Sequence, residues 1–372
     1  MDDAGYMEMA RKLAEKGCGW VSPNPLVGAV IVKDGRVLGQ GYHARYGEKH
    51  AERNALEACT ESPEGAALYV TLEPCCHQGK QPPCVDAILE AGIRRVVVGS
   101  PDPNPLVSGK GVAILRAHGV EVTEGVLRKA CDRLNPVFFH YIRTGRPYVV
   151  FKYAMTLDGK TAAYTGASRW ITGEEARRHV HRQRHRYRGI LVGVGTVLAD
   201  DPLLTCRLEG GRNPVRIVCD SRLRTPLDSQ LVRTAGEAPV ILATCCRDAE
   251  RQEAYRQAGC QVWELPEADG QAAGRVDLEA LLERLGREQV DSVLVEGGGT
   301  LGWQFLQRGL VQRVQAYLAP LLLGGSAAKT PVAGQGFPSP GEAVRLKNSA
   351  VTRLGEDFLI EGEVEEHVYR NH

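Results

Sequence analysis

Three side chains of the types that bind zinc, with a carboxylate beside one of them, form the most informative pattern in the sequence. His50-Ala51-Glu52 is followed by Cys75 and then by Cys84. One imidazole and two thiolates suit a catalytic zinc site, which leaves the fourth tetrahedral position for water. Zinc lowers the pKa of such a water toward roughly 7, so hydroxide would be available at neutral pH. Glu52, near the start of the helix predicted after His50, could then transfer protons without binding the metal.

The order of these residues matches the pattern of zinc nucleobase deaminases, His-x-Glu followed by Pro-Cys-x-x-Cys. Here eight residues, 76–83, separate the two cysteines, and the glycine and prolines among them would let this segment loop out. Cys76 and His77 are rival ligands, but adjacent residues rarely both reach one small ion. A non-catalytic zinc module is the alternative, although such a module needs no Glu52 and usually has four protein ligands.

A second group of residues suits a phosphorylated cofactor. Gly297, Gly298, Gly299 and Gly302 follow a predicted strand and begin a predicted helix, where free N–H groups can bind phosphate. Three of these glycines satisfy G-x-G-x-x-G, but the acidic residue expected about twenty positions later is absent, because residues 317–320 read Tyr-Leu-Ala-Pro. We therefore expect a phosphate site at a helix start in a fold other than the standard dinucleotide fold, with a simple tight turn as the alternative.

Several basic side chains could contact a phosphorylated substrate. Arg184 and Arg207 could hold a phosphate group, because a guanidinium fork matches phosphate oxygens. A nicotinamide cofactor at this site would transfer hydride to a substrate. Lys152 could assist that transfer electrostatically, or could be an exposed lysine at the end of a strand. No residue is evident as the proton donor for such a reduction.

The segment 177–188 is dense in arginine and histidine. Helical spacing would put Arg177, Arg184 and Arg188 near one face, which would suit a deaminase that flips a base out of tRNA. A solvated helix with one or two substrate-binding arginines is the other interpretation. The whole chain has 46 Lys and Arg against 45 Asp and Glu, and this balance favours a small-molecule substrate and no nucleic-acid partner.

The spacing of apolar residues predicts two α/β domains, since 372 residues exceed the usual size of one hydrophobic core. We place the boundary in the polar break 143–147, giving domains 1–145 and 146–372. The strands expected in the first domain are 27–32, 37–41, 67–71 and 95–99, with helices at 6–16, 50–59 and 85–91. The strands expected in the second domain are 148–153, 189–193, 215–219, 239–243 and 292–296.

The amino terminus lacks the basic start and apolar run of a signal peptide, and no run of about eighteen apolar residues is present. These features predict a cytoplasmic protein with no membrane partner. The eleven cysteines would then be reduced, and those outside the zinc pattern are expected to pack in the cores.

Separated motifs along nearly the whole chain resemble the bifunctional riboflavin-biosynthesis deaminase/reductase family. Residues 22–28, Ser-Pro-Asn-Pro-Leu-Val-Gly, look like its substrate loop, and the long spacer in 73–84 is typical of it, although Lys80-Gln81 stands where Arg-Thr is usual. Residues 152–160, 168–172 and 193–207 look like its reductase domain. The resemblance implies a cytidine-deaminase-like three-layer α/β/α domain followed by a dihydrofolate-reductase-like α/β domain.

The same resemblance implies two reactions, and we also expect a homo-oligomer. His50, Cys75 and Cys84 would bind Zn²⁺, with Glu52 as proton donor and Asn24 against the pyrimidine of 2,5-diamino-6-ribosylamino-4(3H)-pyrimidinone 5′-phosphate. The second domain would then use NADPH to reduce the ribosyl group to ribityl. The implied cofactor contacts are Ala154, Trp170, Thr196, Asp200, Ser221, Gly298, Gly299, Thr300, Leu301, Gly302, Trp303 and Gln304. The implied substrate contacts are Ser168, Arg184, Leu204, Arg207 and Glu296. Ser221-Arg222, after a strand, could hold the 2′-phosphate of NADPH.

Overall fold

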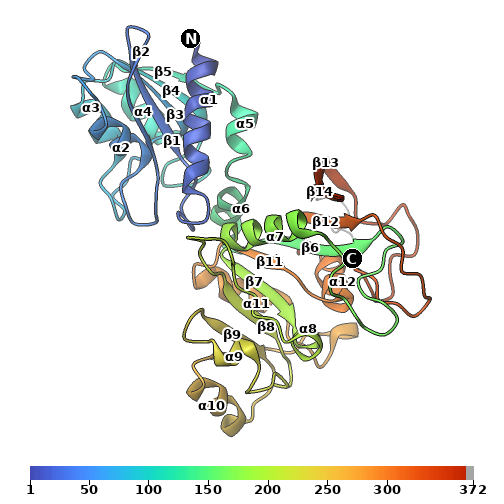
Figure 1. The fold of residues 1–372 in the computed structure, drawn as a ribbon. Helices are drawn as coiled ribbons and strands as arrows, with labels where there is room; N and C mark the ends of the chain where they lie inside the picture. Colours follow the sequence, from blue (N-terminus) through green and yellow to red (C-terminus); the bar gives the residue numbers. More distant parts are fainter. Residues whose placement is uncertain (366–372) are drawn as a thin grey trace. The chain divides into compact units, whose positions relative to one another are not determined.

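The computed structural model describes residues 1–365 and divides into two compact units, Met1–Gly145 and Arg146–His372 (Figure 1). The division falls inside the polar break at 143–147, and the last seven residues of the expected second domain lie outside the described part of the chain. Among the residues described, no helix is both long and apolar enough to cross a membrane. Each unit has its own sheet and its own core.

The first unit is a five-stranded sheet in the order β2-β1-β3-β4-β5, with β1 antiparallel to both neighbours and the remaining pairs parallel. Its strands are β1 (Gly28–Lys33), β2 (Arg36–Tyr42), β3 (Ala67–Leu72), β4 (Arg95–Ser100) and β5 (Glu121–Glu124). Its helices are α1 (Asp3–Ala14), η1 (Glu15–Gly17), α2 (Ala51–Glu57), α3 (Cys84–Glu90), α4 (Lys110–Ala117), α5 (Arg128–Asp132) and α6 (Pro136–Thr144).

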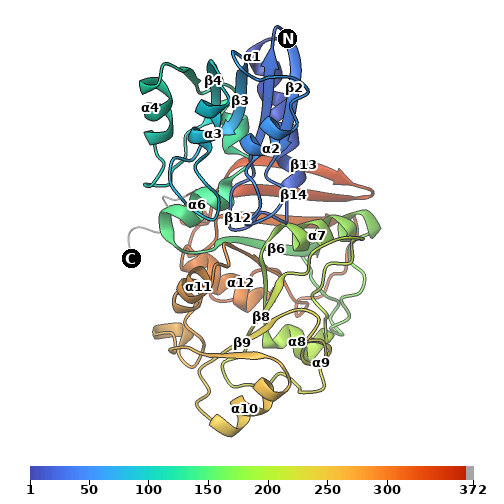
Figure 2. The same cartoon turned by 90° about the vertical axis from the view of Figure 1, so that its left-hand side faces the viewer.

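Alternate residues of these strands point to opposite faces of the sheet, and helices cover both faces. On β1, Ile31 packs in the core beneath α2, α3 and α4, whereas Val30 packs in the core beneath α1 and α5. Figure 2, turned by 90°, shows the same sheet with α2, α3 and α4 on the side that faces the viewer. The tight turn between β1 and β2 has positive φ at both Asp34 and Gly35, as two-residue hairpin turns of type I′ require. The predicted three-layer α/β/α arrangement is confirmed.

The second unit is a nine-stranded sheet in the order β10-β9-β8-β7-β11-β6-β12-β14-β13, parallel from β10 to β12 and antiparallel beyond. Its strands are β6 (Tyr148–Thr156), β7 (Gly189–Gly193), β8 (Val215–Cys219), β9 (Val240–Thr244), β10 (Gln261–Glu264), β11 (Ser292–Val295), β12 (Arg313–Ala319), β13 (Leu346–Leu354) and β14 (Asp357–Val364). Its helices are α7 (Glu174–Arg186), α8 (Val194–Asp200), α9 (Gln230–Arg233), α10 (Ala249–Gln257), η2 (Gly270–Ala272), α11 (Leu278–Arg287) and α12 (Gly299–Gln307).

The parallel strands of this second sheet bring their carboxyl ends to one edge, which is where ligands bind in sheets of this kind. β6, β7, β8 and β11 are the strands that matter for the site, and all four coincide closely with strands expected from the sequence. All four strands contribute to a core beneath α11 and α12, and β7 and β8 also contribute to a second core beneath α9 and α10 on the other face.

Candidate active sites

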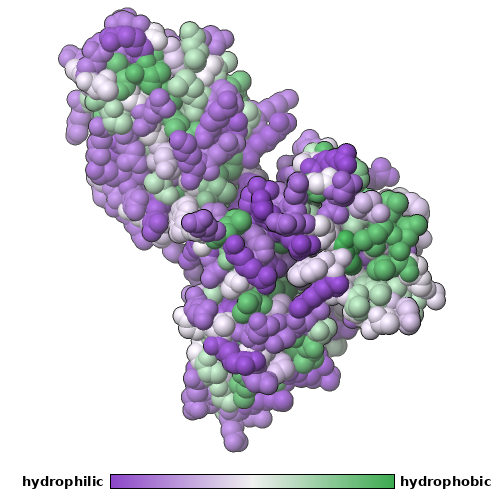
Figure 3. All heavy atoms as spheres, viewed as in Figure 1, coloured by the Kyte–Doolittle hydropathy of each residue, from purple (hydrophilic) through white to green (hydrophobic). Residues whose placement is uncertain are grey.

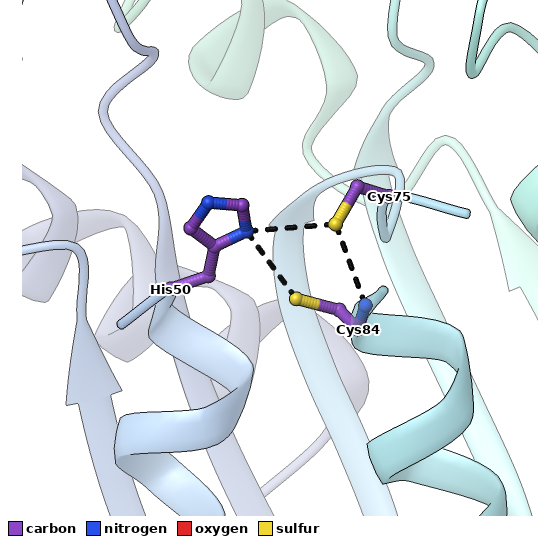
Figure 4. Close-up of side chains that lie close together, drawn as sticks. All are labelled: His50, Cys75 and Cys84. Carbon is purple, nitrogen blue, oxygen red and sulfur yellow. Dashed lines mark hydrogen bonds between the residues drawn. The ribbon is translucent and has the colours of Figure 1, made fainter. Parts of the chain in front are cut away.

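The three residues of the zinc pattern lie together in the first unit. His50 is the residue immediately before α2, Cys84 is the first residue of α3, and Cys75 lies in the loop after β3 (Figure 4). Nδ1 of His50 lies 3.5 Å from Sγ of Cys75 and 3.4 Å from Sγ of Cys84, and the three atoms all lie within 4.8 Å of one another. Zn–S and Zn–N bonds in a tetrahedral site put sulfur and nitrogen roughly 3.6 Å apart, so the donor set fits zinc.

The eight-residue spacer between the cysteines closes as a loop. The N–H groups of Cys84 and Val85 both donate to the carbonyl oxygen of Cys75, at 3.0 and 3.2 Å. These hydrogen bonds hold the two ends of the loop together, so Sγ of Cys84 lies close to Sγ of Cys75. Sγ of Cys76 lies against the carbonyl oxygen of Leu106, at 3.6 Å, away from the other donors.

The carboxyl group of Glu52 is buried beside these ligands, in the first turn of α2, with 3% of the residue exposed. Burial, and then the negative charge of Cys75, raise the pKa of Glu52 to about 7. A carboxyl group with a pKa near the working pH can both accept and donate protons. Glu52 therefore has the burial and the pKa that suit proton transfer, and its catalytic role stays a prediction.

His43, which the sequence did not single out, links Asn24 to the segment just before His50. Its Nδ1 lies 3.1 Å from the carbonyl oxygen of Lys49, and its Nε2 lies 3.1 Å from Nδ2 of Asn24. A carbonyl can only accept, so Nδ1 carries the proton and Nε2 accepts from the amide of Asn24. Burial lowers the pKa of His43, which favours this neutral form. The amide is thereby oriented, with Oδ1 of Asn24 left as its acceptor atom.

The second unit contains a cavity of about 820 Å³ at the carboxyl ends of β6, β7, β8 and β11. Eleven of the expected contact residues line it: Ala154, Ser168, Thr196, Asp200, Ser221, Glu296, Gly298, Gly299, Thr300, Leu301 and Gln304. The lining residues that the sequence did not indicate come mainly from three loops, and they include Thr161, Ala162, Arg275, Lys329, Pro331 and Ala333. The expected contacts that are not part of the lining are Trp170, Arg184, Leu204, Arg207, Gly302 and Trp303.

The glycine-rich turn after β11 leads into α12 at the wall of this cavity. A Cβ on Gly299 would come within 2.7 Å of the carbonyl oxygen of Thr330, and a Cβ on Gly302 within 2.4 Å of the Phe151 ring. These two glycines are therefore required by close packing. A Cβ on Gly298 would meet nothing within 4 Å, so the backbone there is open to a ligand. The N-terminal N–H groups of α12, with this open backbone, fit a phosphorylated dinucleotide.

A buried cluster of one carboxylate and two cations lies at the end of β11. Arg184 of α7 donates from Nε and Nη2 to the two carboxylate oxygens of Glu296, at 3.0 and 2.9 Å, and Nζ of Lys152 lies 3.5 Å from Oε2. Burial alone would raise the pKa of Glu296, but the two cations outweigh it and hold the pKa at about 2. Lys152 lies within β6 with 14% of its side chain exposed, so its interpretation as an exposed strand-end lysine is wrong.

The remaining expected residues lie around the cavity in different ways. Trp170 is 64% exposed, Leu204 is buried with a φ of +54°, and Arg207 is exposed. The expected helical face of three arginines is only partly present. α7 ends at Arg186, so Arg188 is not on the helix.

Comparisons with known proteins identify the family of each unit. Residues 1–100 match the family described as the cytidine and deoxycytidylate deaminase zinc-binding region, and residues 147–360 match the RibD C-terminal domain. A riboflavin biosynthesis protein RibD from Actinobacillus pleuropneumoniae is 52% identical over 361 residues, which cover 97% of this chain and 95% of that protein. The chain belongs to the RibD family.

Solved RibD structures share its fold over almost the full length. Acinetobacter baumannii RibD is 37% identical with a TM-score of 0.87, covering 98% of this chain and 99% of that one. A diaminohydroxyphosphoribosylaminopyrimidine deaminase/5-amino-6-(5-phosphoribosylamino)uracil reductase from Thermotoga maritima is 38% identical with a TM-score of 0.83, at the same coverage. This RibD-family chain is thus a bifunctional enzyme of riboflavin biosynthesis, a zinc-dependent deaminase joined to an NADPH-dependent reductase. The alternative of a tRNA base deaminase is not favoured.

Proposed function

We propose that the first unit, residues 1–145, deaminates 2,5-diamino-6-ribosylamino-4(3H)-pyrimidinone 5′-phosphate. The second unit, residues 146–372, then reduces the ribosyl group of the product to ribityl, giving 5-amino-6-ribitylamino-uracil 5′-phosphate. The grouping of one imidazole and two thiols beside the buried carboxyl group of Glu52 carries the first assignment. The cavity shared by residues expected to contact cofactor and substrate carries the second.

In the deamination, His50, Cys75 and Cys84 would hold zinc, which would act as a Lewis acid and make hydroxide available at neutral pH. Glu52 accepts a proton from the attacking water and transfers it to the ring nitrogen. A second proton, carried by the same carboxyl group, goes to the departing amino group, so that water and the aminopyrimidine give the oxo product and ammonia. Asn24, held by His43, accepts a hydrogen bond from the pyrimidine through Oδ1.

In the reduction, the second unit would hold NADPH, which would supply a hydride to the imine carbon of the ring-opened ribosyl group, while a proton from solvent would go to the imine nitrogen. The cofactor contacts proposed within the cavity are Ala154, Thr196, Asp200, Ser221, Gly298, Gly299, Thr300, Leu301 and Gln304. We retain Trp170, Gly302 and Trp303 as further cofactor contacts, and Ser168, Arg184, Leu204, Arg207 and Glu296 as substrate contacts. Glu296 and Ser168 line the same cavity as the cofactor residues, which would bring hydride donor and acceptor together.

One assay tests the two assignments separately. The purified chain is given the diaminopyrimidine phosphate with and without NADPH, and ammonia release and NADPH oxidation are followed independently. We expect ammonia release in both samples and NADPH oxidation only after deamination. Ammonia release that is never followed by NADPH oxidation would contradict the reductase assignment, and the absence of ammonia would contradict the deaminase assignment.

Residues that line the cavity after β8 could explain a preference for NADPH over NADH. Arg222 and Arg275 are exposed and line the cavity with Ser221, and guanidinium groups bind phosphate well. Arg222→Ala is expected to raise the KM for NADPH by about 10-fold or more while the KM for NADH stays within about twofold. Steady-state kinetics with both cofactors check this. Arg247→Ala, an exposed arginine outside the lining, is the control, and equal losses with NADPH and NADH would contradict the prediction.

We further propose that the enzyme works in the cytoplasm as a homo-oligomer on small-molecule substrates, without nucleic acid. Two arginines of α7 support the expectation that nucleic acid is not a partner, because Arg178 pairs with Glu174 and Arg184 pairs with Glu296 within the chain. Filter binding of tRNA at low and moderate salt tests the point. Tight binding that weakens steeply with salt would restore a nucleic-acid partner.

A further inference from the structure

The segment between Leu204 and β8 runs along α7, and we call residues 205–213 the strap. Two histidines one helical turn apart accept hydrogen bonds from it. The N–H of Arg207 donates to Nδ1 of His181 at 3.2 Å, and the N–H of Arg212 donates to Nδ1 of His185 at 2.9 Å. Residues four apart on a helix share one face, so the two acceptors bind the strap at two points along its length.

Further hydrogen bonds join the strap to α7 at both ends. Nη1 of Arg184 donates to the carbonyl oxygen of Thr205 at 3.1 Å, and Nη2 of Arg212 donates to the carbonyl oxygens of His185 and Tyr187, each at 3.1 Å. Within the strap, the N–H of Cys206 donates to the side chain of Asn213 at 2.9 Å. The basic helix that the sequence singled out is therefore occupied in holding this segment.

The backbone just before the strap needs such restraint. Leu204 has a φ of +54°, in the left-handed region that residues with a Cβ adopt only when their surroundings impose it. The buried Arg216 of β8 donates to the carbonyl oxygen of Leu203 at 3.2 Å. The chain is thus held from β8 before Leu204 and from α7 after it.

The protonation state of the histidines decides whether these bonds exist. A backbone N–H can only donate, so Nδ1 of each histidine must carry no proton, whereas a protonated imidazole has no acceptor atom. Burial, and then the charges of Arg184 and Arg207, together lower the pKa of His181 to about 4, against the opposing effects of Glu296 and of a hydrogen bond to the backbone of Thr205. At neutral pH this ring is an acceptor.

We propose that His181 and His185 are positioning residues of the reductase domain, which as neutral acceptors fix the strap so that Leu204 and Arg207 meet the phosphorylated substrate. This inference rests on the proposed function, in which those two residues contact substrate. Neither histidine touches the reacting atoms. Loss of either acceptor releases the strap and weakens substrate binding. The cofactor contacts at the start of α12 are not affected.

Two substitutions at His181 distinguish the loss of its hydrogen-bond acceptor from a change in the size of its side chain. His181→Leu removes the acceptor, and we expect the KM for the deaminated substrate to rise by about 10-fold or more, with the KM for NADPH within about twofold. His181→Asn places an amide oxygen near the position of Nδ1, and it is expected to restore the KM. Because asparagine does not titrate, the ratio of wild-type KM to that of His181→Asn should rise as the pH falls from 7 toward 4. Deamination by the same chain controls for folding of the first unit.

Hydrogen exchange tests the strap without any activity. In His181→Leu and His185→Leu, the amides of residues 205–213 should exchange at least about 10-fold faster than in wild type. Arg178→Ala, on the same helix with 62% of its side chain exposed, is the matched control and should change neither exchange nor KM. Unchanged exchange and KM in both leucine variants would overturn the proposal. A wild-type chain that oxidises no NADPH would instead overturn the proposed function, and the exchange result would still decide whether the histidines hold the strap.

Discussion

Glu52→Gln is expected to lower the rate of ammonia release by about 10³-fold, within the range that general acid–base catalysis contributes. Glutamine keeps the size and hydrogen-bonding shape of the side chain but cannot carry a proton between water, ring nitrogen and amino group. The three zinc donors are untouched, so the metal content of the purified protein should stay the same. Elemental analysis and ammonia release measured on one preparation check both statements.

The matched control for this substitution is Glu57→Gln, which changes an exposed carboxylate on the same helix that pairs with Lys49. It should leave deamination within about twofold of wild type. NADPH oxidation with the already deaminated substrate should be unaffected in both variants. Deamination at the normal rate by Glu52→Gln would show that another group transfers the protons, and loss of zinc would show that the carboxylate is structural.

Glu296→Gln is expected to destabilise the second unit by about 3–5 kcal/mol, because it leaves Arg184 and Lys152 buried without their counter-charge. NADPH oxidation should be lost with it, whereas ammonia release from the first unit should persist. Urea unfolding followed by a probe in the second unit measures the change. Glu283→Gln, a half-exposed carboxylate that pairs with Arg146 in the same unit, should cost less than about 1 kcal/mol.

The same carboxylate predicts how stability depends on pH. The pKa of Glu296 is about 2 in the folded chain, against an ordinary value of 4.5. A lowered carboxyl pKa stabilises the folded state above pH 4.5, by roughly 3 kcal/mol, and this contribution is lost as the pH falls from 4.5 to 2. Glu296→Gln should therefore unfold with a flatter dependence on pH over that interval. A slope identical to that of wild type would mean that the ion cluster is not intact in solution.

Much of the fold was predictable because its central strands are continuous apolar runs bounded by polar residues. Strands β7 and β8 were predicted with the observed bounds, 189–193 and 215–219. Strand β13 was not predicted, because residues 347–353 are exposed and carry no apolar alternation. Pairing with β14 makes this segment a strand, and that partner is a matter of tertiary structure.

The two sites also differ in how much of each could be predicted from the sequence. The zinc ligands were predictable because residue type and order alone indicate them, even though the spacer was unusual. The partner of Arg184 was not, since Glu296 is 112 residues away in the sequence and only the fold brings them together. Arg184, which we assigned to phosphate from its chemistry, is already paired with the carboxylate of Glu296. His43 escaped notice because a single histidine in a loop has no pattern, and its role follows from its two hydrogen bonds.

The loop between the two cysteines has a consequence for how enzymes of this type diverge. Its ends are tied by the backbone hydrogen bonds from Cys84 and Val85 to Cys75, so the position of the sulfurs does not depend on how many residues the loop contains. Doubling the length of such a closed loop costs only about 0.6 kcal/mol in chain entropy. The length and sequence of residues 76–83 can therefore change, in nature or by design, while the geometry of the three metal-binding side chains is kept.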